Sequence, residues 1–377
     1  MATPRAVLLM ARELAIGGSE RQLTALALAL DRTRFSPHVA CFHEGFRADE
    51  LRAAGIPVLP LPVTSFRNWS AARGARMLGR YLREHDIEVV HTFDAPMNVF
   101  GVPVARLYRT PVVLSSQRAH RELSGNYRPL LRVTDRLAGG VVVNCRFVRD
   151  HLIRDEGVPE QRIHLCYNGL DTAEFHPRGR RKDGPELTVG VVCALRPEKG
   201  LPTLLEAFAL ASKTNPNLSL LIVGSGPMLP DLIARADSQG IAKRTQFRPT
   251  TSQVADLLRS IDIFVLPSLS EAFSNSLMEA MACECAAVAS RTGGNPELIA
   301  DGETGLLFEP GTAAELSAQI QRLAADVDLR RQLAARGAER VRRELNLQAS
   351  AERMAEIYED ALSAREKTRL TNASSPA

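Results

Sequence analysis

Short, continuously apolar runs alternate with amphipathic segments along most of the chain. Residues 6–10, 187–192 and 261–266 are runs of this kind, and they are typical of parallel strands buried on both faces. Between the runs, apolar residues recur every three or four positions, as in residues 23–30, which predicts helices packed against a sheet. This alternation predicts the α/β class, with doubly wound parallel sheets.

One segment interrupts the alternation. Residues 176–186, HPRGRRKDGPE, are rich in glycine, proline and charge, which is typical of a linker. We therefore expect an N-terminal domain over residues 1–175 and a C-terminal domain over residues 187–345, with a cleft between them that serves as the binding site. A last helix is expected over residues 346–365. The polar residues 366–377 are expected to form a flexible tail.

The junction after the apolar run 261–266 brings two carboxylates next to a predicted helix. Glu271 lies in the loop and Glu279 lies about one turn into the helix, for which Ser274 or Asn275 is the expected N-cap. Ligands of open α/β sheets bind where strands end, and bare helix amides favour anions. Carboxylates beside such a site can accept hydrogen bonds from hydroxyl groups, which indicates a sugar on either side of a phosphate.

Three other strand ends carry residues suited to a phosphorylated ligand. Arg196 and Lys199 follow the first strand of the second half, where two cations can hold a diphosphate and stabilise it as a leaving group. Gly17 and Gly18 follow the first strand of the chain, and Gly224 follows the run at 218–223. The glycines allow close approach of a ligand to the backbone. The alternatives are a solvated turn for the two cations and purely geometric turns for the glycines. Ser19 and Gln22 also have the spacing of a helix capping box.

Composition excludes several other classes of protein. The net charge is only +4, from 47 basic and 43 acidic residues, so nucleic-acid binding is not indicated. The six cysteines lack the spacing of a zinc site, and we expect buried, reduced thiols in a cytoplasmic protein. The apolar run near the N-terminus is too short for a signal peptide, and no stretch is long enough for a membrane span.

These stretches together resemble a known family. Residues 271–282, EAFSNSLMEAMA, resemble the E-x7-E signature of retaining glycosyltransferases of the GT-B fold, in the large family four. Four further stretches match places where that family has motifs: residues 17–20, 196–200, 224–227 and 293–297. The resemblance is strong over residues 186–310 and looser in the N-terminal half. It implies two Rossmann-like domains that face each other across a cleft, with the last helix crossing back to the first domain.

The resemblance also implies roles for residues of the second half. Glu279 would accept hydrogen bonds from the ribose hydroxyls of a donor nucleotide, and Glu271 from hydroxyls of the donor sugar. The amides of Asn275, Ser276 and Leu277 would face phosphate and sugar. Family members use neither a covalent nucleophile nor a divalent metal, so no cofactor is expected beyond the nucleotide-sugar donor. The alternative for each glutamate is an ordinary surface carboxylate.

For the first half the implied roles are less specific. Gly18 would lie on the donor side and Gly17 on the acceptor side. Related enzymes often have a histidine in the loop that corresponds to residues 117–121, and it contacts the donor sugar. His120 is the expected catalytic match. Arg118 is closer to the strand end and is expected on the acceptor side, and either of the two could line the active site. A solvated loop is the alternative for both. His91 is expected to line the acceptor side, with a satisfied core histidine as the alternative.

A predicted helix of the first half carries a row of arginines. Arg73, Arg76, Arg80 and Arg83 share one helix face, which fits either a solvated face or contact with an anionic lipid surface or a polyprenyl-diphosphate acceptor. The protein is thus expected to be cytoplasmic, with the inner face of the cell membrane as a candidate peripheral site.

The combined prediction is a retaining glycosyltransferase. It would move a sugar from a UDP- or GDP-linked donor to a glycan or lipid-linked acceptor, in cell-surface polysaccharide or glycolipid synthesis. Two alternatives remain. One is another GT-B enzyme of sugar nucleotides, such as an epimerase or a sugar-phosphate synthase, and the other is a non-catalytic sugar-nucleotide-binding subunit.

Overall fold

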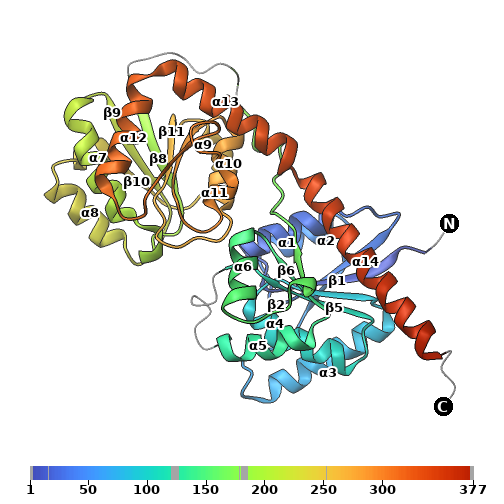
Figure 1. Cartoon of the computed structure of the whole chain (residues 1–377). Coiled ribbons are helices and arrows are strands. Elements are labelled where there is room, and N and C mark those ends of the chain that lie inside the picture. Colours follow the sequence, from blue (N-terminus) through green and yellow to red (C-terminus); the bar gives the residue numbers. More distant parts are fainter. Residues whose placement is uncertain are drawn as a thin grey trace. The chain divides into compact units, whose positions relative to one another are not determined.

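The chain forms two compact units. The computed structural model describes residues 3–15, 17–119, 127–177, 179, 186–251 and 253–373. The first unit comprises Met1–Gly169 together with Leu347–Ala377, and the second comprises Leu170–Asn346 (Figure 1). The division therefore falls a few residues before the predicted linker, of which only part is described.

The first unit contains a seven-stranded parallel sheet with strand order β3-β2-β1-β4-β5-β6-β7. Its strands are β1 (Arg5–Glu13), β2 (Phe35–His43), β3 (Val58–Pro60), β4 (Val89–Thr92), β5 (Val112–Gln117), β6 (Gly140–Val143) and β7 (Ile163–Leu165). Its helices are α1 (Gly18–Ala29), α2 (Phe46–Ala53), α3 (Trp69–Glu84), α4 (Ala95–Leu107), α5 (Arg128–Leu137), α6 (Arg146–Arg154) and α14 (Leu347–Ala373), with a 3-10 turn at Glu160–Arg162.

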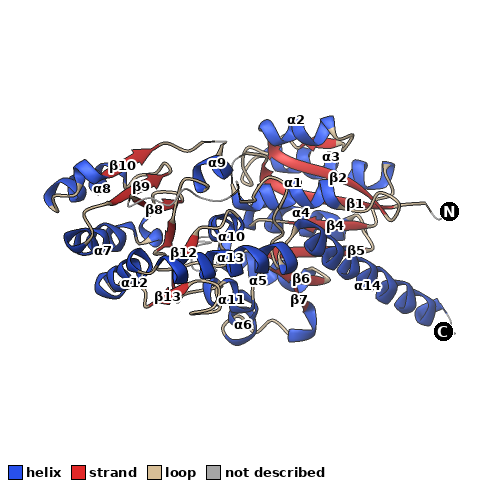
Figure 2. Ribbon diagram, turned by 90° about the horizontal axis from the view of Figure 1, so that it is seen from above, coloured by secondary structure: helices blue, strands red, loops and turns tan. Residues whose placement is uncertain are grey.

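Helices cover both faces of this sheet because its strands are apolar on both sides (Figure 2). Val7 and Leu9 of β1 belong to a core that also contains residues of α1, α2 and α14. Leu8 and Met10, which alternate with them, belong to a second core with residues of α3 and α4. The continuous apolar runs of the sequence thus correspond to strands buried from both sides.

The second unit repeats this plan with a six-stranded parallel sheet of order β10-β9-β8-β11-β12-β13. Its strands are β8 (Leu187–Val192), β9 (Leu218–Val223), β10 (Thr245–Arg248), β11 (Ile263–Leu266), β12 (Ala286–Ser290) and β13 (Leu306–Phe308). Its helices are α7 (Leu201–Thr214), α8 (Leu229–Ser238), α9 (Val254–Leu258), α10 (Asn275–Ala282), α11 (Asn295–Leu298), α12 (Ala313–Ala325) and α13 (Val327–Glu344), with 3-10 turns at Pro197–Lys199 and Ala242–Arg244.

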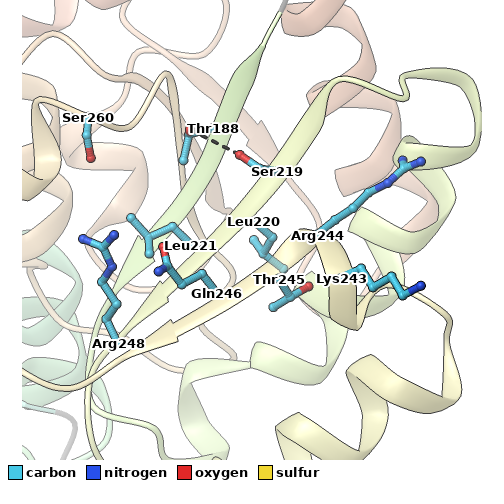
Figure 3. Close-up of a pocket in the computed structure, with 10 residues that line it drawn as sticks. All are labelled: Thr188, Ser219, Leu220, Leu221, Lys243, Arg244, Thr245, Gln246, Arg248 and Ser260. Carbon is cyan, nitrogen blue, oxygen red and sulfur yellow. Dashed lines mark hydrogen bonds between the residues drawn. The ribbon is translucent and has the colours of Figure 1, made fainter.

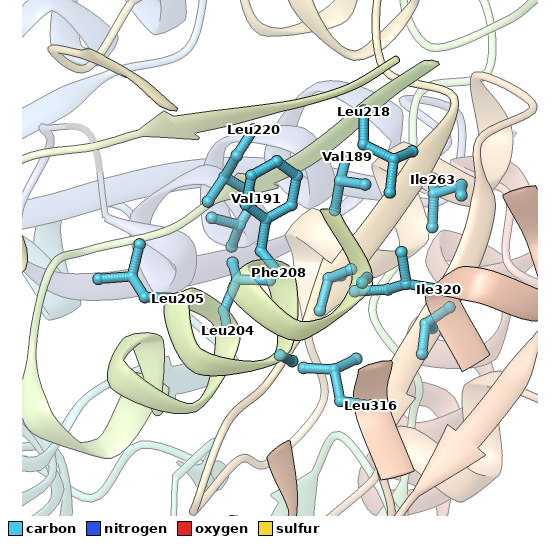
Figure 4. Close-up of a cluster of buried hydrophobic side chains, with 14 of the residues drawn as sticks. Val189, Val191, Leu204, Leu205, Phe208, Leu218, Leu220, Ile263, Leu316 and Ile320 are labelled. Atoms are coloured by element: carbon cyan, nitrogen blue, oxygen red, sulfur yellow. The ribbon is translucent and has the colours of Figure 1, made fainter. Parts of the chain in front are cut away.

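One core of this unit lies between the sheet and α7 with α12. Phe208 of α7 is fully buried against Val191 and Leu220 of neighbouring strands, and Ile320 of α12 packs in the same cluster (Figure 4). Burying an aliphatic or aromatic side chain of this size stabilises the fold by about 1.5–3 kcal/mol. The predicted α/β class and doubly wound topology are confirmed.

The last helix is longer than predicted. Helix α14 was expected to end at residue 365, but it continues to Ala373, and residues 374–377 lie outside the described residues. It belongs to the first unit, where it contacts α1 and β5. Tyr358 of α14 is fully buried, and its ring packs edge-on against Phe35 with ring centroids 5.9 Å apart.

Two further expectations concern the whole chain. None of the six cysteines, all of which lie in the described part of the chain, forms a disulfide bond, and five of them are buried. In the described part of the chain, no helix combines the length and the apolar character that crossing a membrane requires.

Candidate active site

The predicted donor-side residues of the second unit meet at one edge of its sheet. Strands β8 and β11 are hydrogen-bonded neighbours. Their first paired residues, Val189 and Ile263, are 74 positions apart in the sequence. The strand order reverses between these two strands, and open α/β sheets bind ligands at the carboxyl ends of such strands. The loops after them carry Lys199 and Glu271.

Lys199 and Glu271 form an ion pair at this edge. Lys199 Nζ donates to Glu271 Oε2 at 2.6 Å, and their side chains are only 20% and 13% exposed. Ser268 Oγ donates to the same oxygen at 3.2 Å, and the amide of Ala272 donates to Oε1 at 3.3 Å. Arg196 precedes the 3-10 turn at Pro197–Lys199, and its side chain is exposed, with no ion pair to the described residues. The carboxylate of Glu271 is therefore held in place from three directions.

The loops at this edge approach one another at glycines. Gly293 has φ +57°, and a Cβ there would lie 1.9 Å from the carbonyl oxygen of Glu271. Gly224 has φ +154°, and a Cβ there would lie 1.9 Å from the carbonyl oxygen of Cys193. No side chain fits at either position. Each glycine therefore allows the backbone of its loop to contact the backbone of the loop after a neighbouring strand.

Helix α10 begins beside the ion pair, and Ser274 is its N-cap, as predicted. Ser274 Oγ accepts from the amide of Leu277 at 3.3 Å, so this amide already has a partner. The amide of Ser276, in the first turn, has no acceptor among the described residues. Leu277 itself is fully buried. A ligand at this end would therefore meet the amides of the first turn, and it would compete with Ser274 for that of Leu277.

Glu279 lies one turn further along α10 and is 2% exposed. A carboxylate so well buried is not an ordinary surface residue, because charged side chains are fully buried only when they have polar partners. The alternative that Glu279 is an ordinary carboxylate on the helix surface is therefore excluded.

Three polar residues at this edge were not predicted. Ser290, after which β12 ends, donates from Oγ to the carbonyl oxygen of Ser268 at 2.6 Å, and Asn295 Nδ2 donates to the carbonyl of Ser290 at 3.0 Å. All three side chains are fully buried. The two hydrogen bonds hold the loop that contains Glu271 against the end of β12. The signals in the sequence were the polar residues Ser268 and Ser290 at the ends of apolar runs and, for Asn295, its place in the stretch 293–297.

In the first unit, His91 is a core residue. It is fully buried, with Nδ1 2.8 Å from Tyr358 Oη and Nε2 2.7 Å from Ser116 Oγ. Burial holds its pKa well below 6.5. Both ring nitrogens are occupied within the core, so the prediction that His91 lines the acceptor side is wrong and the core alternative holds.

The other predicted residues of this unit lie at its strand ends. Gly17 is the N-cap of α1 and Gly18 its first residue, without a side-chain cap. The predicted capping box is absent because Gln22 instead exchanges two hydrogen bonds with the backbone of Gly169, at 3.0 and 3.1 Å. Arg118 directly follows β5 and is partly buried. His120 lies outside the described residues.

Asp94, which was not predicted, caps α4 at the adjacent strand end. Its Oδ1 accepts from the amide of Met97 at 3.0 Å and its Oδ2 from the amide of Arg12 at 2.6 Å. Burial raises the pKa of Asp94 to about 6, although these two hydrogen bonds act in the opposite direction. The pKa of this carboxyl therefore lies well above that of an exposed aspartate.

A polar groove of the second unit is separate from this site. It has a volume of about 410 Å³ and is lined by side chains of the edge strand β10 and its neighbours, among them Thr188, Ser219, Gln246 and Arg248 (Figure 3). Ser219 and Gln246 are exposed. The groove contains none of the predicted site residues, and it explains why polar residues interrupt the apolar pattern of β8 and β9.

The fold is that of GT-B glycosyltransferases. HepE from Anabaena, solved in complex with UDP, superimposes with a TM-score of 0.81 at 20% identity, covering 94% of this chain and 100% of that chain. Sucrose-phosphate synthase from Thermosynechococcus elongatus superimposes with a TM-score of 0.78 at 20% identity, covering 96% of this chain and 100% of that one.

Sequence comparison gives the family. Residues 16–174 match the model "Glycosyltransferase Family 4" and residues 172–340 match "Glycosyl transferases group 1". The GDP-mannose-dependent alpha-(1-6)-phosphatidylinositol monomannoside mannosyltransferase of Mycolicibacterium smegmatis is 30% identical over 280 residues, 68% of this chain and 71% of that protein. Alpha-maltose-1-phosphate synthase of the same organism is 28% identical over 306 residues, 72% of this chain and 78% of that protein. The D-inositol 3-phosphate glycosyltransferase of Rhodococcus opacus is 32% identical, over 45% of its own length. The chain belongs to glycosyltransferase family 4.

Proposed function

We propose that the chain transfers a sugar from a UDP- or GDP-linked donor to a glycan or lipid-linked acceptor, with retention of the anomeric configuration. The synthesis of a cell-surface polysaccharide or glycolipid is the process that such an acceptor suits. The observation that carries the proposal is the ion pair of Lys199 and Glu271 at the reversal point of the second sheet.

This pair can hold a donor without being broken. The ammonium group of Lys199 has three donors, and one of them is used by Glu271 Oε2 at 2.6 Å, so two remain for phosphate oxygens. Glu271 Oε1 receives only the long 3.3 Å bond from Ala272 and can accept from a sugar hydroxyl. Arg196, exposed in the same loop, supplies a second cation for the diphosphate leaving group. Glu279 of α10 would accept from the ribose hydroxyls.

Neither a divalent metal nor a covalent enzyme intermediate is part of the proposal. Arg196 and Lys199 supply positive charge at the place where the leaving diphosphate develops negative charge, and the departing phosphate oxygen would take the proton of the acceptor. Glu271 is engaged by a cation and two hydrogen-bond donors, which suits a fixed acceptor of hydroxyl groups better than an attacking nucleophile. Turnover is therefore expected to persist in excess EDTA.

The names of the relatives guide the choice of substrates for a test. One relative is named for GDP-mannose and HepE was solved with UDP, which supports UDP- and GDP-sugars as first candidates. Alpha-maltose-1-phosphate synthase is named for a sugar-phosphate product, so a sugar-phosphate synthase remains the second candidate. Product analysis distinguishes these two candidates from the remaining alternatives: an epimerase would change the donor sugar without transferring it, and a non-catalytic binding subunit would form no product.

The test is nucleotide release from a panel of UDP-, GDP- and ADP-sugars, with glycan, lipid-linked and sugar-phosphate acceptors. Lys199→Ala and Glu271→Gln are compared with Lys213→Ala and Glu303→Gln, which remove an exposed lysine and an exposed glutamate of the same unit. We expect the first two variants to lose about a hundredfold or more in kcat/KM and the control variants to keep it. Analysis of the product anomer by NMR tests retention. Absence of release and transfer across the panel in the wild type would refute the proposal.

We further propose that α3 of the first unit contacts an anionic membrane surface. Arg73, Arg76, Arg80 and Arg83 are all exposed, and none forms an ion pair with the described residues. Trp69, the single tryptophan of the chain, is 83% exposed at the start of the same helix. Exposed arginines beside an exposed tryptophan are typical of helices that lie at a lipid interface.

The single tryptophan makes this surface directly testable. On addition of anionic vesicles at low salt, we expect a blue shift of the Trp69 emission and pelleting of the protein with the vesicles. Replacing the four arginines of α3 by glutamine should abolish both effects, and neutral vesicles should give neither. Unchanged emission and no pelleting with anionic vesicles would contradict the proposal.

A further inference from the structure

Arg118 of the first unit is a cation without a counter-charge among the described residues. Its Nη2 donates to Asn168 Oδ1 at 2.6 Å, and its guanidinium carbon lies 5.0 Å from the centre of the Phe93 ring. No carboxylate of the described residues forms an ion pair with it. Other partly buried arginines do have such partners: Arg34, for example, pairs with Glu352 and Glu359, both at 2.8 Å.

The groups around Arg118 shield its guanidinium from water, but none of them is a negatively charged partner. Burial lowers the pKa of Arg118 from 12.5 to about 10, and the groups that act in the opposite direction are Cys166, Tyr358 and Cys145. Burial raises the pKa of both Cys166 and Tyr358, so these two are neutral near pH 7. Arg118 remains protonated there. Burying a charged group without a charged partner costs folding free energy. An anion that binds beside Arg118 would provide the favourable charge interaction that burial took away.

A second polar residue lies next to Arg118 at the same edge of the sheet. The pairing of Gln117 with Val143 places Arg118 beside Asn144, which directly follows β6. Asn144 is 3% exposed, and its Oδ1 has no hydrogen-bond partner within the part of the chain that the structure describes. A buried amide oxygen without a partner is uncommon in folded proteins, and it suits a hydroxyl group of a ligand. Together the two residues fit a molecule that carries an anionic group and a hydroxyl group.

We propose that Arg118 binds an oxyanion of the acceptor, a phosphate or a carboxylate, and that Asn144 accepts a hydrogen bond from a hydroxyl group of the same molecule. This proposal rests on the proposed transfer reaction, because it assigns the acceptor to the first unit. It concerns a different anion from the donor diphosphate, whose cations Arg196 and Lys199 belong to the second unit. The planar guanidinium can bind either oxyanion through two parallel hydrogen bonds.

The first experiment measures anion binding without turnover. In the full chain with Lys199→Ala, which weakens anion binding on the donor side, phosphate, pyrophosphate and acetate are titrated by calorimetry. Adding Arg118→Gln is expected to weaken binding of the preferred anion about tenfold or more. Adding Arg154→Gln, which removes an exposed arginine of α6, should leave it unchanged. Comparison of acetate with the two phosphates separates a carboxylate acceptor from a phosphorylated one.

Two further measurements distinguish a binding role from a structural one. In buffer without these anions, Arg118→Gln should unfold at the same urea concentration as the wild type or a higher one, since it removes a charge that has no partner and glutamine can still donate to Asn168. Binding of UDP and GDP should not change, because Arg196 and Lys199, the cations proposed for the donor diphosphate, lie in the other unit. If Arg118→Gln binds all three anions as tightly as Arg154→Gln does, the proposal is overturned, whether or not the chain shows transferase activity.

Discussion

Gly293→Ala is expected to disable the candidate site through the backbone alone. The first effect is conformational, because φ +57° costs an ordinary residue about 1–2 kcal/mol. The second is steric. The new Cβ would lie 1.9 Å from the carbonyl oxygen of Glu271, whereas real Cβ atoms essentially never come within 3.0 Å of another heavy atom. The two loops must therefore separate by at least 1.1 Å, the difference between these distances.

A separation of this size reaches the ion pair directly. The displaced carbonyl belongs to Glu271, whose carboxylate oxygen lies 2.6 Å from Lys199 Nζ. Moving a positioned group by about 1 Å can lower a rate about a hundredfold. We expect kcat/KM to fall by about that factor, and the free energy of unfolding to fall by about 1–3 kcal/mol beyond the conformational cost, as for other overpacked sites.

Gly311→Ala is the matched control. Gly311 has φ +79°, and a Cβ there meets nothing within 4 Å, so this variant bears the conformational cost without the clash. Urea unfolding measures the stability of both variants, and nucleotide release in the presence of donor and acceptor measures their turnover. Equal stability and equal turnover of the two variants would show that the contact between Gly293 and Glu271 does not hold the site.

Three other predictions concern buried polar groups. Tyr358→Phe leaves Nδ1 of His91 without its partner at 2.8 Å and should lower the free energy of unfolding by about 1–3 kcal/mol in urea; an unchanged midpoint would contradict the assigned bond. Ser290→Ala removes the 2.6 Å bond to the carbonyl of Ser268 and should cost a similar amount together with a loss of turnover, whereas normal turnover would show that this bond does not position the loop. Burial raises the pKa of Asp94 from 3.8 to about 6, so the folded state holds the proton more tightly than the unfolded state, and the stability this provides is fully present below pH 3.8 and is lost as the pH rises through 6. Between pH 4 and pH 6 the wild type should lose about 2 kcal/mol of unfolding free energy relative to Asp94→Asn, measured by urea unfolding at each pH, and parallel pH profiles would disprove the assignment.

The larger features of this fold can be predicted from the sequence because they depend on periodicity. Strands buried on both faces appear as continuous apolar runs, and parallel strands place their carboxyl ends at one edge of the sheet. This rule alone brings Lys199 close to Glu271, 72 residues later. The N-cap Ser274 is equally local, because it depends only on the residues just before a helix.

The failures have physical causes as well. The partners of His91 lie on β5 and on α14, and Tyr358 is 267 residues away in sequence, so no local pattern could show that this histidine is satisfied in the core. Gln22 has the spacing of a capping residue, but the backbone of Gly169 is a competing partner that the sequence does not reveal. The final helix continues beyond its apolar pattern because Glu, Lys, Arg and Leu favour helix once it is nucleated.

Helix α14 also affects the order in which the chain can fold during synthesis. Residues of the first unit precede and follow the second unit in the sequence, so the ribosome completes Leu170–Asn346 before it makes α14. Until then, β1 and α1 lack the cover that Met354, Tyr358 and Leu362 provide in the finished core. The second unit can fold as soon as it emerges, whereas the first must wait with an apolar face exposed, which is the condition in which nascent chains aggregate or recruit chaperones.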